Sequence, residues 1–295
     1  MSISEHERGQ QRYFDAEFEG YSRYQLENWR RSFLNRIFTA LGIGSTRNES
    51  YLDIGVGGSG YTVIEATRKG CVSVGVDISS EGVRKAKTFA NSELGRNANF
   101  DFVVGSIDNL PFKDETFAKI STIAVLEHVP DDKRAILEMS RVSKPDGEVF
   151  ITVPNAYSRI FPIFWLPYFF WDKRVGHLRH YKAEDLIRQF SNCRFTPKDM
   201  RYSGHAYKLI QILLSFVRPN MTRGNSKLWW KMEELDLRNS SRAGGLQLNI
   251  VLKKGKVLKF PLEMNLDPGP RTDLKKTHAG LIQSTSFARH PPDRW

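Results

Sequence analysis

The sequence predicts an α/β protein in which a mostly parallel sheet carries helices on both of its faces. Three observations predict this class. Between residues 50 and 153, short apolar runs alternate with amphipathic helical segments, the order that parallel strands joined by crossover helices require. The first apolar run leads into a glycine-rich turn at residues 55–60, and an acidic residue, Asp77, directly follows the second run.

The elements follow in a regular order along the chain. Residues 11–41 have apolar side chains at helical spacing and predict one or two amphipathic helices, which Gly42 and Gly44 end. Strands are then expected at residues 50–54, 71–76, 100–104, 120–124 and 149–153. Helices are expected between or after them at residues 61–68, 80–92, 131–142 and 183–190. Two last strands are expected at residues 195–202 and 245–252.

The composition fits one large α/β domain with additions, or two small domains. Of the 295 residues, 40% are hydrophobic and 12% aromatic, which is ample for a packed core. The two cysteines, Cys71 and Cys193, argue against a disulfide framework and a cysteine-built zinc site. The N-terminal residues lack a signal-peptide pattern, and no stretch reaches the roughly 20 apolar residues of a membrane-spanning helix. We therefore expect a cytoplasmic protein.

Positive charge is concentrated in the second half of the chain. The net charge is +11, yet residues 49–155 carry 12 basic and 16 acidic side chains, whereas residues 156–254 carry 18 basic and 7 acidic ones. One interpretation is a well-solvated surface. The other is an acidic partner, namely a phosphorylated or carboxylated substrate, an anionic membrane surface or RNA. The absence of an appended RNA-binding module argues against nucleic acid.

The glycine-rich turn has the features of a nucleotide-binding loop. Gly55, Gly57 and Gly60 allow positive φ angles and let a ligand approach the backbone closely. The turn opens a helix, whose free amide groups and dipole favour an anion. Residues 55–60 fit Gly-x-Gly-x-x-Gly, a pattern typical of dinucleotide sites, although a glycine-rich turn without any ligand can fit it too.

Two carboxylates beside this turn indicate a different cofactor. Asp53 stands two residues before Gly55, where the pyrophosphate of a dinucleotide would face a like charge. The position suits a cationic ligand such as S-adenosylmethionine, and Asp77 would accept hydrogen bonds from both ribose hydroxyls. Leu52–Gly57 and Gly75–Ile78 thus resemble the cofactor site of class I S-adenosylmethionine-dependent methyltransferases. The resemblance assigns cofactor contacts to Asp53, Gly55, Gly57, Gly60, Asp77 and Ile78.

Further segments resemble the same family in the same order. Val104–Phe112 is similar to the segment that holds the adenine ring, with the Ile107 amide facing the ring and Ser106 in place of the usual acidic residue. The Ser106 hydroxyl can still accept from the adenine amino group, but without charge assistance. The resemblance also implies a contact between Glu127 and the methionine end of the cofactor. The remaining matching segments are Ile123–Asp131, Arg141–Gly147 and Thr152–Asn155.

The resemblance implies a fold and a division of the chain. The fold is a Rossmann-like, seven-stranded, mostly parallel sheet with an antiparallel last strand, an N-terminal helical lid and an aromatic insertion after the fifth strand. The expected parts are a lid at 1–48, a cofactor-binding core at 49–155, an acceptor-side insertion with the C-terminal strands at 156–254, and a basic, loosely ordered tail at 255–295. The most similar branch includes ubiquinone- and menaquinone-type enzymes and many glycan and lipid enzymes.

An aromatic, proline-containing stretch, Ile160–Trp171, follows the expected core. It is too short and too often interrupted by proline to span a bilayer. It is either a buried insertion that closes the acceptor pocket or an exposed apolar lid that meets a lipid at a membrane interface. A second apolar stretch, Ala206–Val217, could form a helix beside it. Cationic neighbours such as Lys173 and Arg174 would suit phosphate headgroups.

The candidate catalytic side chains are two histidines, because histidine exchanges protons near neutral pH. His128 follows the fourth strand, and His180 lies in the segment Gly176–Tyr181, which recurs in relatives with saccharide or lipid-linked acceptors. For His128 a purely structural role in packing is an equally good interpretation. His177 and His180 are two residues apart and no third ligand is evident, and we therefore expect no metal site.

The sequence thus predicts a methyltransferase that uses S-adenosylmethionine and acts on a small, anionic, lipid-linked or glycan acceptor. Three alternatives stay open. They are an RNA methyltransferase, which the basic half favours; an NAD(P)-dependent oxidoreductase, which Asp53 disfavours; and a non-catalytic S-adenosylmethionine-binding protein at a membrane. Peripheral association with a membrane in the cytoplasm is compatible with the predicted methyltransferase and with the non-catalytic binding protein.

Overall fold

The structure is a computed structural model that describes residues 5–256 except 25, 27, 161, 206–230, 232–234 and 237–243. These residues belong to one compact unit, Met1–Val257. The strands are β1 (Ser50–Ile54), β2 (Val72–Asp77), β3 (Phe100–Val104), β4 (Phe117–Ile123), β5 (Ser143–Pro154), β6 (Phe195–Ser203) and β7 (Gln247–Lys254). The helices are α1 (Glu5–Glu19), α2 (Asn28–Leu41), α3 (Tyr61–Arg68), α4 (Ser80–Leu94), α5 (Asp132–Val142), α6 (Trp165–Val175) and α7 (Ala183–Ser191). Short 3₁₀ turns are η1 (Leu126–His128), η2 (Tyr157–Arg159) and η3 (Pro162–Phe164).

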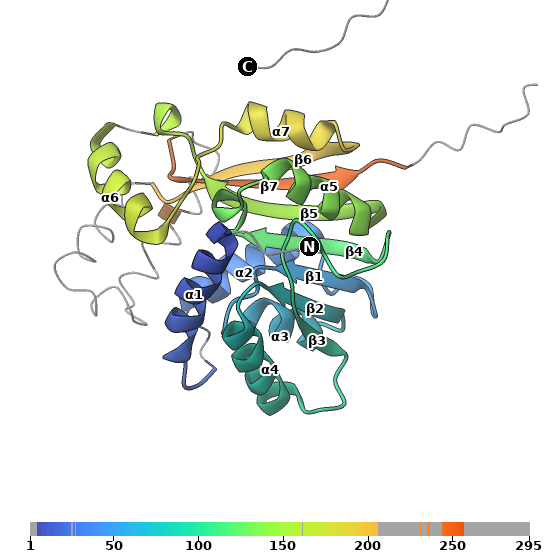
Figure 1. Cartoon of the computed structure of the whole chain (residues 1–295). Helices are drawn as coiled ribbons and strands as arrows, with labels where there is room; N and C mark the ends of the chain where they lie inside the picture. The colour runs from blue at the N-terminus through green and yellow to red at the C-terminus, as the bar shows by residue number, and fades with distance from the viewer. Residues whose placement is uncertain are drawn as a thin grey trace, which may run out of the picture. The chain divides into compact units, whose positions relative to one another are not determined.

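The sheet has the strand directions of the predicted fold. Its seven strands follow the order β3-β2-β1-β4-β5-β7-β6 (Figure 1). Strands from β3 to β5 pair in parallel, and β7 pairs antiparallel with both β5 and β6. The expected bounds hold for β1, α3 and β3. β5 begins earlier than its apolar run, because Ser143 in the polar turn pairs with Phe117 of β4.

Helices cover both faces of the sheet and bury an apolar layer on each. On one face α5 and α7 pack against strand residues that include Leu52, Ile120 and Leu248. On the other face α2 packs against Tyr51 and Phe150, and α3 and α4 continue that layer toward β3. Successive strand residues point to opposite faces, and Tyr51 and Leu52 therefore belong to different layers.

The predicted N-terminal lid consists of two separate helices with different positions. α2 is part of the core, whereas α1 lies at the end of the sheet toward which the parallel strands point (Figure 1). Phe18 of α1 packs so closely that a Cβ at Gly58 or Gly82 would come within 2.9 or 2.7 Å of its atoms. Asp15 accepts a hydrogen bond from the hydroxyl of Ser79, the N-cap of α4, where the helix dipole favours a carboxylate.

The aromatic stretch after β5 forms η3 and α6, with one buried and one exposed side. Phe164 and Tyr168 are buried in a small cluster with Ile160 and Leu246. The other side exposes Ile163, Trp165, Leu166, Phe169 and Phe170. The stretch is therefore neither wholly a buried insertion nor wholly an exposed lid.

Two other expectations lie largely outside the described residues. The stretch Ala206–Val217 is one of them, and the tail at residues 255–295 is the other, except for Gly255 and Lys256. Within the described part of the chain, no helix combines the length and the apolar character that crossing a membrane requires.

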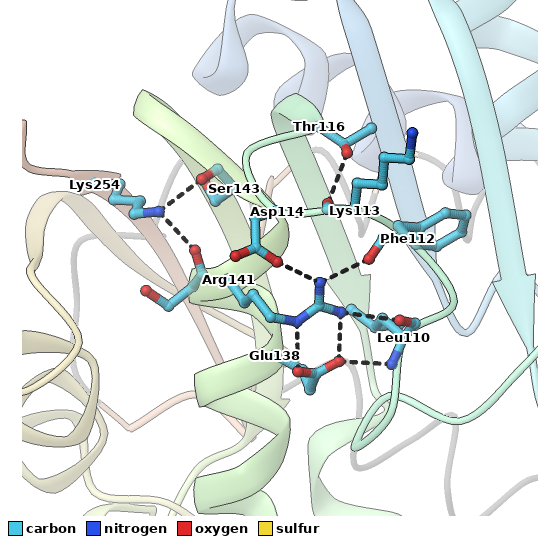
Figure 2. Close-up of polar contacts among 10 residues, drawn as sticks. Leu110, Phe112, Lys113, Asp114, Thr116, Glu138, Arg141, Ser143 and Lys254 are labelled. Carbon is cyan, nitrogen blue, oxygen red and sulfur yellow. Dashed lines mark hydrogen bonds and ion pairs between the residues drawn. The ribbon is translucent and has the colours of Figure 1, made fainter.

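A polar network fixes the loop between β3 and β4 to α5 (Figure 2). The Nε and Nη2 groups of Arg141 donate to the two carboxylate oxygens of Glu138, at 2.7 and 2.8 Å. The same guanidinium donates to the main-chain oxygens of Leu110 and Phe112 and to Asp114. Glu138 in turn accepts from the Leu110 amide at 2.8 Å. Two side chains of α5, Arg141 and Glu138, thereby hold this loop after the end of β3.

Candidate active site

A cavity of about 230 Å³ opens at the carboxyl ends of β1, β2 and β4. The strand order reverses between β1 and β4, and ligands of open α/β sheets bind at such a point. Toward the loop after β3, the cavity borders a larger side space of about 540 Å³. The walls of both include Glu7, Ile78, Gly105 and Ser106. The predicted cofactor residues in the wall are Gly55, Gly57, Asp77, Ile78, Ser106 and Ile107.

Asp77 is held in this wall by two backbone amides. Its Oδ2 accepts from the Gly57 amide at 2.8 Å, and its Oδ1 accepts from the Ser79 amide at 2.9 Å. Burial raises the pKa of the Asp77 carboxyl above its ordinary value, while these amide hydrogen bonds act in the opposite direction. A carboxylate has about four acceptor positions, and the two that remain fit the pair of ribose hydroxyls that the sequence assigned to Asp77.

The structure places Asp53 behind the cavity wall rather than in it. The side chain is 2% exposed and accepts hydrogen bonds from the hydroxyls of Thr62 in α3 and Ser121 in β4. Burial raises the pKa of Asp53 to about 7. Asp53 therefore ties the start of α3 to the sheet beneath the glycine turn, which the sequence alone had interpreted as a direct cofactor contact.

The three predicted glycines have different roles. Gly55 has φ +76°, and a Cβ there would lie 2.2 Å from Cγ2 of Val125, which leaves room only for glycine. Gly57 has φ +63° and presents its amide to the cavity wall. Gly60 is not in the wall, and a Cβ there would come 2.9 Å from Ala86 of α4. Gly60 thus serves the packing of α3 against α4.

At the adenine end of the predicted site, α1 supplies a carboxylate that the sequence reading missed. The Ser106 hydroxyl donates to Oε1 of Glu7 at 3.0 Å. Both residues line the cavity, together with Ile107. The family's usual acid is absent at position 106, but a carboxylate from the lid helix lies beside it. The acceptor for an amino group is thus better assigned to Glu7 than to the Ser106 hydroxyl.

A second cavity of about 280 Å³ adjoins the first at Phe14, Ala124 and His128, which line both. Its remaining wall includes Tyr168 of α6 and the polar residues Glu127 and His177. One space thus has the features of a cofactor site, and the other has room for a second reactant next to it.

Glu127 lies in the second cavity and not in the first. The side chain is 1% exposed, and within the described residues its Oε2 has no hydrogen-bond partner. Burial raises the pKa of Glu127 to about 8. Its Oε1 lies 3.9 Å from Nε2 of His177. Glu127 therefore lines the second cavity, whereas the resemblance implied a contact with the methionine end of the cofactor.

The two histidines predicted as catalytic are placed differently. His128 lines both cavities, and burial, with the neighbouring His177, lowers its pKa to about 4. His180 lines neither cavity. Its Nδ1 contacts the carbonyl oxygen of Asn155 at 2.9 Å, and its Nε2 contacts Oδ2 of Asp172 at 2.6 Å. Both ring nitrogens of His180 are thus engaged, one by Asn155 and one by Asp172.

Asp172 and His177 are functional candidates that the sequence reading did not single out. Nδ1 of His177 bonds to Oδ1 of Asp172 at 2.7 Å, and the Tyr157 hydroxyl also donates to Asp172. Burial raises the pKa of Asp172, but the hydrogen bonds from His177, His180 and Tyr157 outweigh it and hold the pKa at about 2. Asp172 thus orients His177 toward the cavity. The available sequence signal was the segment Gly176–Tyr181, which contains His177 as well as the predicted His180.

A family model and two named methyltransferases match part of the chain. Residues 52–151 match the family described as methyltransferase domain. The norajmaline N-methyltransferase of Rauvolfia serpentina is 37% identical over 107 residues, which are 36% of either chain. The demethylmenaquinone methyltransferase of Shouchella clausii is 28% identical over 155 residues, or 51% of this chain and 61% of that protein. The chain therefore matches about a third of the length of the norajmaline enzyme and about three fifths of the length of the demethylmenaquinone enzyme.

The fold has a wider match among solved structures. The YcgJ protein of Bacillus subtilis superposes with a TM-score of 0.53 and 19% identity, over 76% of this chain and 99% of that one. The strand order, the Asp77 geometry and the family match at residues 52–151 agree. Residues 52–151 thus form a domain of the class I S-adenosylmethionine-dependent methyltransferase family.

Proposed function

We propose that the chain transfers a methyl group from S-adenosylmethionine to an oxygen or nitrogen atom of a small acceptor that is anionic and linked to a lipid or glycan. The junction of the two cavities at Phe14, Ala124 and His128 carries this proposal. S-adenosylmethionine, when bound, supplies a methyl group on a sulfonium. The junction is where the walls of a cofactor space and an acceptor space meet.

The wall of the first cavity has groups that fit each part of the cofactor. Asp77 would hold the ribose hydroxyls through its two free acceptor positions. Glu7, together with the Ile107 amide, would hold the adenine. The glycine turn would lie along the methionine part, because its backbone comes close to the cavity without side chains.

In the second cavity the residues of this chain align the acceptor and exclude water. Alignment of two reactants can supply roughly 7–11 kcal/mol of the barrier reduction, and it is the main demand of a displacement whose leaving group needs no proton. Phe14 and Tyr168 form apolar parts of the wall. Glu127, His128 and His177 form a polar part that would polarise an O–H or N–H bond of the acceptor.

Three observations support the class of acceptor. The exposed side of α6 is apolar, and Lys173 lies with its Nζ 4.6 Å from the centre of the Phe169 ring. Residues 156–254 are strongly basic. The demethylmenaquinone relative is named for a lipid-soluble acceptor. Together they favour a substrate with an apolar part and an anionic part over RNA.

Calorimetry tests the cofactor part of the proposal. We expect binding of S-adenosylmethionine and of its demethylated product, and none of NADH. Asp77→Asn should weaken binding by about 2–4 kcal/mol, because charge-assisted hydrogen bonds to the ribose are lost. Asp101→Asn is the matched control, since Asp101 lies on β3 and is largely exposed beside Lys87. Binding of NADH alone would overturn the proposal.

The acceptor is tested with a methyl-labelled cofactor and three fractions of the producing cells, namely lipids, soluble glycans and RNA. We expect label in a lipid or glycan product that carries an acidic group. Label found in RNA alone would overturn the acceptor class while leaving methyl transfer intact.

A further inference from the structure

We propose that Glu127, His128 and His177 bind one divalent transition-metal ion in the wall of the acceptor cavity. The proposal deepens the proposed function and rests on it, because it assigns that wall a role toward the acceptor. One ligand atom from each of the three side chains lies within 4.8 Å of the other two. All three residues line the cavity of about 280 Å³, so that an ion held by them faces the space for the acceptor.

The hydrogen bonds of the two imidazoles leave the correct nitrogen for a metal. Nδ1 of His128 lies 3.3 Å from the carbonyl oxygen of Gly176, which can only accept, and this nitrogen therefore carries the hydrogen. Nδ1 of His177 likewise donates to Asp172 at 2.7 Å. Each ring thus keeps a lone pair on Nε2. A carboxylate or carbonyl behind a ligating histidine is the usual arrangement in metal sites.

Glu127 supplies an independent observation that points to a ligand. The side chain is almost completely buried, and its Oε2 has no hydrogen-bond partner among the described residues. Such an oxygen is costly to bury, because it loses its water without compensation. A cation held between Glu127 and the two Nε2 atoms would compensate that loss.

A neighbouring cluster of Asp172, His177 and His180 also has ligand atoms within 4.8 Å of one another, but it is already satisfied. The oxygens of Asp172 accept from both histidines and from Tyr157. Both ring nitrogens of His180 have partners. This cluster therefore orients His177, and the ion belongs to the Glu127 side.

The donor set indicates the kind of ion and of acceptor. Two imidazole nitrogens and one carboxylate suit Zn²⁺, Mn²⁺, Fe²⁺ or Co²⁺ better than Mg²⁺ or Ca²⁺, which prefer oxygen ligands. Three protein ligands leave coordination positions open toward the cavity. An acceptor with two neighbouring oxygens, such as vicinal hydroxyls or a hydroxyl beside a carboxylate, would fill them. This narrows the anionic acceptor of the proposed function to a chelating one.

The expectation of no metal site arose because the sequence offers no ligand close to His177 and His180. The structure brings the adjacent pair Glu127 and His128 next to His177, with the two imidazole rings 5.0 Å apart between centres. The third ligand is therefore distant in the chain and near in the fold.

Metal binding to the full chain, stripped with EDTA and titrated with Co²⁺ or Zn²⁺, tests the site. We expect one ion per chain and, for Co²⁺, a visible absorption band. The chelating probe 4-nitrocatechol should change that band. Glu127→Gln and His177→Asn should each weaken binding at least about 100-fold, since even groups behind the ligands change affinity 10–100-fold. His180→Asn should change it by a smaller factor.

The outcomes separate this inference from the proposed function. Calorimetry with S-adenosylmethionine on the same variants should give unchanged affinity, which also shows that they fold. Failure of the wild-type chain to bind one equivalent of Co²⁺ or Zn²⁺ at micromolar concentration would overturn the metal site even if the cofactor binds. The ligand set would be overturned if His180→Asn and His177→Asn lowered the affinity for the metal ion equally while Glu127→Gln left it unchanged. An unchanged band with 4-nitrocatechol would overturn the chelating acceptor.

Discussion

At the scale of single residues, Asp53 shows how a buried carboxyl can serve a site that it does not contact. Its hydrogen-bond partners are the hydroxyl groups of Thr62 and Ser121. The described groups that change its pKa include no cation. Burial raises the pKa of Asp53 to about 7 from an ordinary value of 3.8, because the hydrogen bonds from the two hydroxyls offset the effect of burial only in part. The folded chain therefore favours the protonated form.

This pKa predicts a pH-dependent stability. A group whose folded pKa is raised stabilises the fold fully below about pH 4, and this stabilisation is lost as the pH rises through about 7. Between pH 5 and pH 8 the loss should be about 2–3 kcal/mol. Asp53→Asn does not titrate and should show a smaller fall in melting temperature over that range. Equal falls in the variant and the wild type would mean that Asp53 is ionised throughout.

Glu7 and Ser106 form the second pair at this scale. Glu7→Gln should weaken the binding of S-adenosylmethionine by about 1–2 kcal/mol, because a charged hydrogen-bond acceptor becomes neutral. Ser106→Asp in the Glu7→Gln chain should restore most of the affinity, because it returns the family's usual acid to its place. In the wild-type chain Ser106→Asp should weaken binding, since two carboxylates then compete. Calorimetry on the four chains gives the coupling energy between the two positions. If the two changes in binding free energy simply added, Glu7 and Ser106 would not share one role.

At the scale of elements, the loop between β3 and β4 depends on one helix. Arg141 and Glu138 of α5 together engage the loop at Leu110, Phe112 and Asp114 (Figure 2). The loop also buries its own apolar side chains Ile107 and Leu110 in the core. The polar contacts from α5 therefore add to this apolar packing and orient the loop backbone next to the cavity.

We expect Arg141→Ala to lower the free energy of unfolding by about 2 kcal/mol, because it leaves two main-chain oxygens and Glu138 without their donor. Arg188→Ala is the matched control. Its ion pair with Asp185 is exposed and should be worth no more than about 0.5 kcal/mol. Denaturant unfolding measures both. Similar small losses would show that the network in Figure 2 contributes specificity of conformation without net stability.

At the scale of the whole molecule, α6 lies near the end of the sheet toward which the parallel strands point (Figure 1). The walls of the two cavities include residues at the same end of the sheet. The helix buries Tyr168 toward the acceptor cavity and exposes its aromatic side. A lipid-linked acceptor could thus reach the cavity without leaving the membrane surface. This follows from the proposed acceptor class and is directly testable.

Vesicle flotation should show binding to anionic vesicles that weakens with salt. Leu166 and Phe170 are 67% and 53% exposed, and serine at both positions should reduce binding at least about tenfold through lost apolar contact. Leu137→Ser is the control, because Leu137 is 59% exposed on α5. If the wild-type chain does not bind anionic vesicles, α6 is not a membrane-binding element.

Much of the fold could be predicted because its signals are local. Apolar runs gave β1 and β3, helical spacing gave α3, and the acid at the end of β2, Asp77, does lie beside the glycine turn as expected. The early start of β5 could not be predicted, since Ser143 joins the sheet only through its partner Phe117. The structure likewise separates Asp53 and Gly60, which support the turn, from Gly57, which contacts Asp77.

The architecture and the cofactor could be inferred from the sequence, because strand periodicity and a strand-turn-helix motif each involve residues that are close together in the chain. Which side chains line the second cavity depends instead on contacts between distant parts of the folded chain. Glu7 meets Ser106 across 99 residues, and Glu127 meets His177 because the chain after α6 folds back over η1. Contacts of this kind depend on how α1 and α6 close over the sheet. Burial of their apolar sides drives that closure, and no local pattern records its geometry.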